Sequence, residues 1–368
     1  MTLSRRKTLA LIGGGTILAA SAAAGGFTAT RRPDKALMPW ERAGEYEDIR
    51  HFALSYAILA PNPHNRQPWL VELKGENRIV LYRDTTRELE HTDPFQRQLV
   101  IGLGCFLELM RIAAAERGFA VDLQIYPEGE DGPVAIADFS EGAQKDLLFS
   151  QILGRRTCRK PFADTAVPSE MVDALSGYGE IITQFERVAE IRELTWQAMK
   201  VESETPRTLS ESIDLLRLGK AEINANPDGI SLGGPLMETL VAFGVVTRHG
   251  QRDPSSKQFA TTQEMFRDIA MATPAYAVIK TGQNTRRGQI DAGRRWVRLN
   301  LATTGLGLSL HPVSQALQEY SEMAEHYTHI HEMLAEPGET VQMLGRLGYG
   351  PDVAQSPRWP LETRMLNG

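Results

Sequence analysis

The sequence predicts an α+β fold built from two tandem halves. Short runs rich in Val, Ile and Leu, typical of strands, alternate with longer amphipathic runs typical of helices. One helical pattern occurs twice, and the spacing from Gly104 to Gly118 equals the spacing from Gly293 to Gly307. A chance agreement between two amphipathic helices is the alternative explanation.

The strands are expected where β-branched and apolar residues cluster between turn residues. A further helix is expected to open at Pro168 and to end at Gly177, because proline suits the first helical turn and glycine suits the C-terminal end. In chain order the predicted strands are residues 69–73, 78–82, 121–125, 134–138, 181–188, 276–280 and 341–348.

Composition excludes several classes of protein. The chain has 368 residues, of which 42% are hydrophobic and 23% charged, as in ordinary globular proteins. Its net charge of -6 argues against a general nucleic-acid binder. Two cysteines, Cys105 and Cys158, are too few for a disulfide scaffold or a cysteine-rich metal site, and we expect no metal site. A small molecule is therefore the expected ligand.

The N-terminal residues 1–30 have the pattern of an export signal. The pair Arg5-Arg6 precedes an apolar run rich in alanine and glycine, which favours the twin-arginine route. We therefore expect the export machinery as a partner, a periplasmic or secreted location, and no stable membrane insertion. A membrane-anchored or uncleaved N-terminus is the alternative. Residues 31–45 are predicted to be a linker.

Residues 60–68, here called the amide loop, carry an unusual density of amides and prolines. Pro61 and Pro63 exclude a helix and stiffen the chain. Several side chains in the loop both donate and accept hydrogen bonds, and such a loop can read the polar edge of a flat heterocycle. The plain alternative is a helix-to-strand turn whose amides cap the backbone. The side chains in question are Asn62, His64, Asn65 and Gln67.

A second cluster, residues 154–162, is strongly cationic. Arginine forks and a Ser/Thr hydroxyl are natural ligands of a phosphate dianion. A charge cluster of this kind can also be a solvated face. The candidate phosphate ligands are Arg155, Arg156, Thr157 and Arg159.

Residues 60–69, APNPHNRQPW, resemble the A-P-S-x-x-N-x-Q-P-W loop of FMN-dependent nitroreductases, with Asn62 and Pro63 in place of the usual serines. Residues 155–162 resemble the R-R-S-x-R-x-F opening of the same family. The repeated helical pattern resembles the central helix of its dimer core. With the export signal, the combination is similar to the Acg-like branch. The resemblance implies a nitroreductase-like fold whose halves form an intramolecular pseudo-dimer.

The resemblance also implies FMN as the cofactor and NAD(P)H as the electron donor. The phosphate ligands carry over to Arg155 and Thr157, with Arg156 and Arg159 beside them, and the C-terminal arginine carries over to Arg358, with Arg346 as the fallback. Asn65 and Gln67 are expected to donate to the flavin ring. We expect no catalytic side chain, because hydride passes over the flavin face. The ring-lining positions carry over to Pro61, Asn62, His64, Asn65, Gln67, Pro312, Val313 and Ser314.

The predicted halves are residues 46–145 and 146–368, and a surplus segment at residues 195–262 is predicted to be a lid, with surface decoration as the alternative. The first half carries the amide loop and the second carries the arginines, so we expect one flavin site between them. The predicted function is hydride transfer from NAD(P)H to a small-molecule acceptor that the sequence does not identify. The alternatives are a storage protein that holds FMN under a lid without turnover, and a degenerate fold without flavin.

Overall fold

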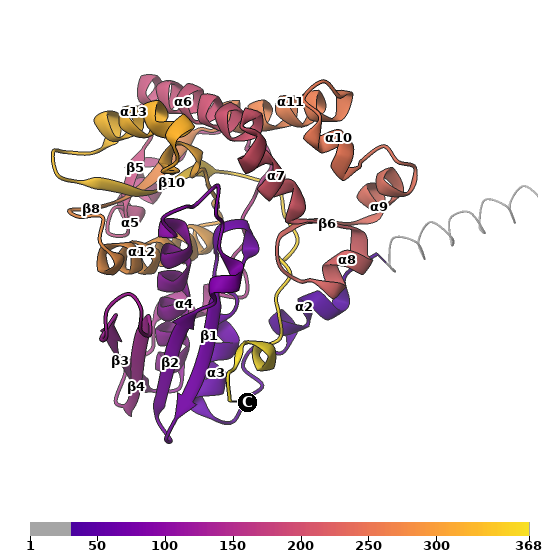
Figure 1. Cartoon of the computed structure of the whole chain (residues 1–368). Helices are drawn as coiled ribbons and strands as arrows, with labels where there is room; N and C mark the ends of the chain where they lie inside the picture. Colours follow the sequence, from indigo (N-terminus) through magenta and orange to yellow (C-terminus); the bar gives the residue numbers. More distant parts are fainter. Residues whose placement is uncertain (1–30, 368) are drawn as a thin grey trace, which may run out of the picture.

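The computed structural model describes residues 31–367, so the predicted export signal at residues 1–30 lies outside the described residues. Two long helices, α4 (Arg97–Glu116) and α12 (Arg286–Gly305), pack against each other at the centre of the molecule. They lie between two four-stranded antiparallel sheets, one from each half of the chain (Figure 1). The α+β prediction is therefore confirmed.

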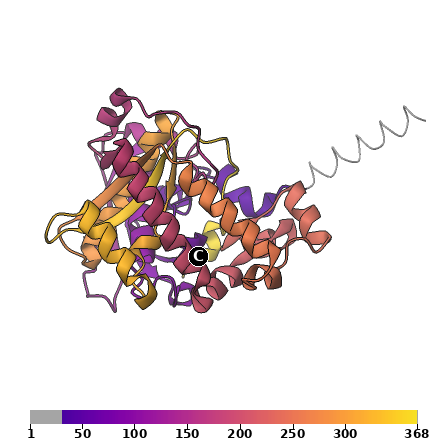
Figure 2. The same ribbon diagram turned by 90° about the horizontal axis from the view of Figure 1, so that it is seen from above.

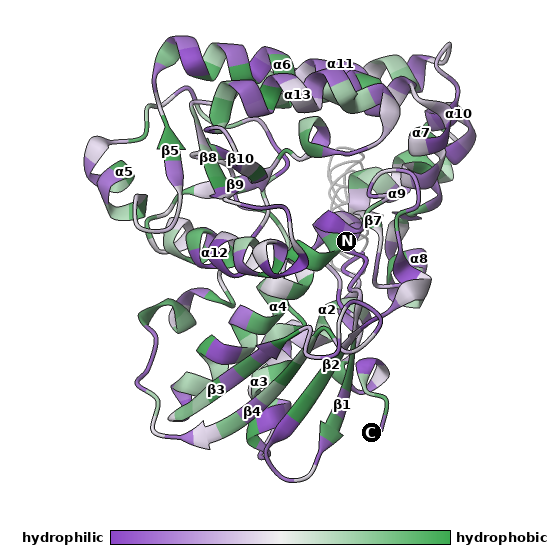
Figure 3. Ribbon diagram, turned by 60° about the vertical axis from the view of Figure 1, so that its left-hand side comes forward, coloured by the Kyte–Doolittle hydropathy of each residue, from purple (hydrophilic) through white to green (hydrophobic). Residues whose placement is uncertain are grey.

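The first half builds its sheet in the order β1-β2-β4-β3. Asp48 begins its first helix by accepting hydrogen bonds from the backbone N–H groups of Arg50 and His51. Figure 3 shows β1 and β2 as largely hydrophobic, in keeping with strands that face a core. In chain order the elements are α3 (Ile49–Ala57), β1 (Trp69–Lys74), β2 (Arg78–Arg83), α4, β3 (Phe119–Ile125) and β4 (Ala135–Glu141).

The second half repeats this plan. Its sheet has the order β5-β8-β10-β9, which is again first, second, fourth and third strand in chain order, and its long helix again follows the second strand. Figure 2 shows α6, α11 and α13 side by side over this half. The elements are α5 (Ser169–Leu175), β5 (Glu180–Ile182), β8 (Ala275–Thr281), α12, β9 (Ser309–Pro312), α13 (Ala324–Leu334) and β10 (Thr340–Gly348).

The repeated glycines explain how closely the two long helices meet. A Cβ atom built on Gly104 would lie 2.2 Å from the carbonyl oxygen of Ile290, and one built on Gly293 would lie 1.9 Å from that of Ile101. Ile101 and Ile290 occupy the same position in their respective helices, so the two contacts are mirrored. Only glycine permits this approach, and the repeat in the sequence is thus a structural repeat.

A large insertion, residues 183–274, connects β5 to β8, whereas a tight hairpin connects the matching strands β1 and β2. It arches along one side of the molecule (Figure 1). Its first helix begins at Phe185, so the predicted strand 181–188 is wrong beyond Ile182. The insertion contains α6 (Phe185–Glu204), α7 (Pro206–Asp214), β6 (Leu216–Leu218), α8 (Gly219–Ala225), β7 (Ile230–Leu232), α9 (Pro235–Ala242), α10 (Arg248–Arg252) and α11 (Lys257–Met271).

Both ends of the described chain differ from the predicted division. The expected linker, residues 31–45, contains α2 (Asp34–Glu41), whose Leu37 and Trp40 are buried. The C-terminal segment leaves the second half and returns to the first, where Met365 forms a parallel bridge with Val71 (Figure 1). The first half is therefore completed by residues from the far end of the sequence.

Helix α4 is long and apolar enough to span a membrane by length and composition alone. Its window is 89% buried inside the protein, between α3, α12 and the first sheet. We therefore assign it as a core helix.

Candidate functional site

The amide loop is held in a strained backbone conformation. His64, Asn65 and Gln67 have φ angles of 46°, 52° and 51°, in the left-handed region that residues other than glycine rarely adopt. Asn62 stabilises the loop from within, because its Oδ1 accepts a 2.7 Å hydrogen bond from the backbone N–H of Gln67. Strain of this kind persists only where surrounding contacts enforce it, and it is common at binding sites.

The amides of Asn65 and Gln67 are bound to protein backbone. Gln67 is fully buried, and its Nε2 donates to the carbonyl oxygen of Pro227 at 2.7 Å, while its Oε1 accepts from Trp359 N–H at 2.9 Å. Asn65 Nδ2 donates to the carbonyl oxygen of Pro357 at 3.0 Å. The expectation that these two amides donate to a flavin ring is corrected, because their hydrogen-bonding groups are already engaged. For these two residues the backbone-capping alternative holds.

Two predicted phosphate ligands, Arg155 and Arg358, converge on the start of the amide loop. Arg155 donates to the carbonyl oxygen of Leu59 at 3.1 Å and to Asn300 Oδ1 at 3.1 Å. Arg358 donates to the carbonyl oxygens of Leu59 and Ala60, both at 3.0 Å. Both arginines are buried, and burial lowers the pKa of Arg155 to about 10 and that of Arg358 well below its ordinary value.

Arg159 is another of the predicted phosphate ligands. The residue as a whole is exposed by surface area, while burial of its guanidinium among surrounding protein atoms lowers its pKa. Its charge contributes to lowering the pKa values of His64 in the amide loop, His311 on β9 and Arg358 in the C-terminal segment. One arginine is therefore within electrostatic reach of three segments that are far apart in sequence.

These arginines lack the usual acidic partners. Among the described residues, neither Arg155, Arg159 nor Arg358 forms an ion pair with a carboxylate. The Nε atoms of Arg155 and Arg358 are buried and without a hydrogen-bond partner in the described chain. Buried cations without counter-charges are costly, so an anion at this place would be stabilised.

Burial also keeps the histidines of the site neutral. Burial lowers the pKa of His64 to about 4, and that of His311 lies well below its ordinary value for the same reason. His64 Nδ1 is buried without a partner among the described residues, whereas His311 Nδ1 lies 3.0 Å from Arg346. Both rings therefore add hydrogen-bonding groups without adding charge.

The remaining predicted residues are spread around this centre. Thr157 is half-buried, and its hydroxyl makes no hydrogen bond to a described residue. Arg156 donates to the carbonyl oxygens of Leu153 and Arg155 and lies 5.3 Å from the ring of Trp40. Pro61 is half-buried in the amide loop. Pro312 ends β9, and Val313 and Ser314 follow it, with Val313 buried and Ser314 half-buried.

Arg346, the fallback for the C-terminal phosphate ligand, has a structural role. Its Nε donates to Thr273 Oγ1 at 2.6 Å, and its guanidinium lies 4.2 Å from the centre of the Phe162 ring. Its other nitrogens donate to backbone carbonyls and approach His311. These contacts engage four of its five N–H groups, and Arg358 likewise engages four. Arg358 differs in that it binds the amide loop directly, through Asn65 Oδ1, and it therefore stays the predicted C-terminal arginine of the site.

The sequence did not single out Trp40 or Asn300. Trp40 lies in the segment predicted as a linker, and the guanidinium of Arg358 is 5.6 Å from its ring. The apolar run that ends at Trp40, residues 36–40, was an available signal of burial. Asn300 lies on the buried face of α12, where an amide requires a polar partner, here Arg155.

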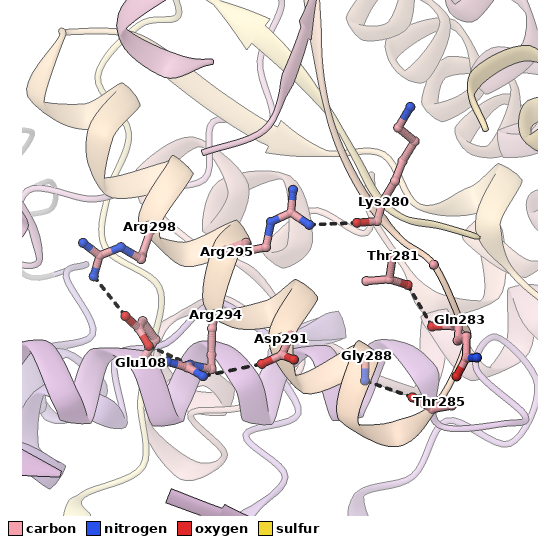
Figure 4. Close-up of a pocket in the computed structure, with 11 residues that line it drawn as sticks. Glu108, Lys280, Thr281, Gln283, Thr285, Gly288, Asp291, Arg294, Arg295 and Arg298 are labelled. Atoms are coloured by element: carbon pink, nitrogen blue, oxygen red, sulfur yellow. Dashed lines mark hydrogen bonds and ion pairs between the residues drawn. The ribbon is translucent and has the colours of Figure 1, made fainter. Parts of the chain in front are cut away.

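A separate groove of about 590 Å³ lies along the outer face of α12 (Figure 4). It is also rich in arginine, but two of its arginines are paired with a carboxylate. Arg294 and Arg298 bind Glu108 at 2.8 and 2.9 Å, and Arg295 donates to the carbonyl oxygen of Lys280. Arg294 and Arg298 thus already have an anionic partner, which Arg155 and Arg159 lack among the described residues.

No family model matches the chain. The protein named "Putative NAD(P)H nitroreductase acg" from Mycobacterium tuberculosis is 34% identical over 125 residues, which span 32% of this chain and 37% of that protein. "Putative NAD(P)H nitroreductase Rv3131" from the same organism is 22% identical over 85% of this chain and 88% of its own length. The chain is a relative of proteins named NAD(P)H nitroreductases. The resemblance found in its motifs is thereby confirmed.

Solved structures give looser matches. The FMN-dependent nitroreductase NfnB from Mycobacterium smegmatis in complex with NADPH is 16% identical, covers 58% of this chain and 94% of its own, and has a TM-score of 0.36. A putative nitroreductase from Anabaena variabilis is 12% identical, covers 74% and 69%, and has a TM-score of 0.40. Superpositions this loose assign no role to any residue of this chain.

Proposed function

We propose that this chain is an FMN-dependent oxidoreductase of the nitroreductase type, with one flavin site between its halves. The observation that carries the proposal is the convergence of Arg155, Arg159 and Arg358, without a carboxylate, beside the amide loop. Such a site suits a phosphate monoester, which arginine forks bind through charge-assisted hydrogen bonds. The names of its curated relatives support the same reaction class.

The residues at this place fit the cofactor. Arg159 and Thr157 have uncommitted donors and would hold the phosphate, while Arg155 and Arg358 would add positive charge from behind. Bound FMN supplies the redox chemistry by taking two electrons from NAD(P)H and passing them to a small-molecule acceptor. Neutral His64 and His311 would offer hydrogen bonds beside the ring, and the stiff amide loop would fix its position.

A single site is supported by the difference between the halves. Residues 58–68 separate α3 from β1, whereas residues 176–179 alone separate the matching elements α5 and β5. The second half thus has no room for a second amide loop in its described part. The shared strand order and the mirrored glycine contacts support an arrangement in which the halves form an intramolecular pseudo-dimer.

The proposal includes the place of action. The Arg5-Arg6 pattern supports export by the twin-arginine machinery to the periplasm or the cell exterior. That route carries folded proteins, so a flavin bound in the cytoplasm would travel with the chain. The test is the location of the full-length chain in a cell whose twin-arginine route is intact or blocked.

A second candidate is a storage protein that holds FMN without turnover. It is favoured by the size of the insertion, residues 183–274, because a segment of that size lying over the flavin would exclude nicotinamide and acceptor.

One experiment separates the candidates: the visible spectrum of the purified chain, followed by NADPH without oxygen. A yellow protein that bleaches supports the oxidoreductase. A yellow protein that stays yellow with NADPH, NADH and other donors supports storage. A colourless protein that does not bind added FMN would contradict both.

A further inference from the structure

A tight turn of the insertion, residues 226–229, sits directly on the amide loop. The carbonyl oxygen of Pro227 accepts from Gln67 Nε2 at 2.7 Å and from Asn65 Nδ2 at 3.4 Å. The backbone N–H of Gly229 donates to the carbonyl oxygen of Asn65 at 3.3 Å. Gly229 has a φ of 73°, and a Cβ there would lie 2.3 Å from the carbonyl oxygen of Leu215, so the turn requires glycine.

Asp228 at the tip of this turn is the centre of a buried ionic cluster. Its carboxylate binds Arg87 at 2.8 Å, Arg217 at 2.8 Å and Arg66 at 3.7 Å. Asp228 is 7% exposed. Arg66 belongs to the amide loop, Arg87 follows β2 and Arg217 lies on β6, so one carboxylate joins the insertion to two segments of the first half.

The loop that the turn contacts is the strained one. His64, Asn65 and Gln67 all have positive φ angles, and Gln67 and Asn65 are the residues that bind Pro227. A backbone with positive φ angles at residues other than glycine returns to ordinary conformations unless surrounding contacts hold it. Among the described residues, the hydrogen bonds that reach this loop from outside the first half come from the insertion turn and the C-terminal segment.

We propose that Asp228 is a positioning residue that locks the insertion onto the amide loop, so that the insertion is a fixed wall of the site and not a lid. The inference rests on the proposed function for its effect on flavin. The lock itself consists of contacts between protein residues, so it can be tested without flavin. A lid would need a weak, exposed contact with the loop it uncovers, whereas this contact is buried and multiply bonded.

The test compares the full chain with Asp228→Asn, which keeps the shape of the side chain but removes its charge. Gln67→Leu, which removes the bonds to Pro227 and Trp359, is a second variant if the first fails to fold. Asp214→Asn is the matched control, because Asp214 lies in the same insertion but pairs with Arg252 at the exposed surface. Backbone hydrogen exchange in residues 62–67, the FMN dissociation constant, and kcat and KM are measured for each.

We expect exchange in residues 62–67 to accelerate about tenfold or more in Asp228→Asn and in Gln67→Leu, because removing one partner leaves a buried group uncompensated. FMN should bind about tenfold more weakly, with the control unchanged in both. Unchanged exchange in both variants would overturn the lock. Faster turnover with unchanged FMN affinity would show a gate and would overturn the fixed wall. A wild-type chain that binds no FMN would end the proposed function, while the exchange comparison still decides the lock.

Discussion

Arg155 and Arg358 donate hydrogen bonds to the same carbonyl oxygen, that of Leu59, at 3.1 and 3.0 Å. Leu59 lies just after α3, where the helix leaves carbonyl groups without partners and a partial negative charge. One arginine comes from the start of the second half and the other from the C-terminal segment. The two cations therefore fix the point at which the amide loop begins, and they do so from two distant parts of the chain.

Replacing Arg358 should destabilise the fold even without cofactor. Arg358→Met leaves the buried carbonyls of Leu59 and Ala60 without one of their donors, and we expect the free energy of unfolding to fall by about 3 kcal/mol. Urea denaturation of the flavin-free protein measures it. Arg295→Met is the control, because Arg295 is exposed and has one backbone acceptor. Equal losses in both variants would contradict the structural role of Arg358.

Replacing Arg159 should affect binding without affecting folding. Its guanidinium makes no hydrogen bond to a described residue, so Arg159→Gln should leave the unfolding midpoint unchanged. The loss of a charge-assisted bond to phosphate should weaken FMN binding by about 2 kcal/mol, or roughly thirtyfold. Flavin fluorescence titration gives the dissociation constant. Exposed Arg287, replaced by Gln, should have no effect, and an equal effect there would indicate a merely diffuse charge contribution.

A methyl group at the crossing of the long helices should separate the halves. In Gly293→Ala the new Cβ would meet the carbonyl oxygen of Ile101, and the backbone has no room to yield. We expect the free energy of unfolding, measured by thermal denaturation, to fall by about 3 kcal/mol. Gly305→Ala in the same helix is the control, since its nearest neighbour is the Gln151 side chain at 3.5 Å, and alanine should be neutral or slightly stabilising there. Similar losses for both would show that the close approach is not required.

The amide loop should make the protein sensitive to acid. Burial holds the pKa of His64 at about 4, below its ordinary 6.5, so the unfolded chain binds the proton more readily. The stability from the neutral ring is complete above about pH 6.5 and is lost as the pH falls towards 4. His64→Gln should therefore flatten the decline of the unfolding free energy in this range.

The quantity to follow against pH is the difference in unfolding free energy between His64→Gln and the wild type. Burial raises the pKa of Asp93 to about 6, and that group changes stability with the opposite slope over the same range. It contributes equally to both proteins and cancels in the difference. If the unfolding free energies of the two proteins ran parallel between pH 6.5 and pH 4, the His64 ring would be in contact with water and not buried.

The sequence predicted most of the two sheets and both long helices, because each depends on local pattern. It failed where a distant partner decides the structure. Leu216 to Leu218 form β6, which is absent from the predicted strands, because they pair with β7 across the insertion. The partners of Gln67 are Pro227 and Trp359, and no local pattern indicates that an amide will bind residues so far along the chain.

The same limit applies to the candidate site. Arg155, Arg159 and Arg358 were identified from motifs, yet the motifs do not say which of them has donors to spare. That division follows from burial: the arginines enclosed near Leu59 bind carbonyls, and the one that reaches solvent does not. Asn300 and Trp40 enter only through packing against these arginines.

The mirrored glycine contacts have a consequence for how the protein behaves on dilution. In an assembly of two chains, a cleft shared between subunits disappears when the concentration falls below the dissociation constant of the pair. Here Gly104 and Gly293 join two halves that a single polypeptide already holds together. The contact between the two halves is therefore retained at any protein concentration, so the occupancy of the proposed flavin site would depend on the supply of ligand alone.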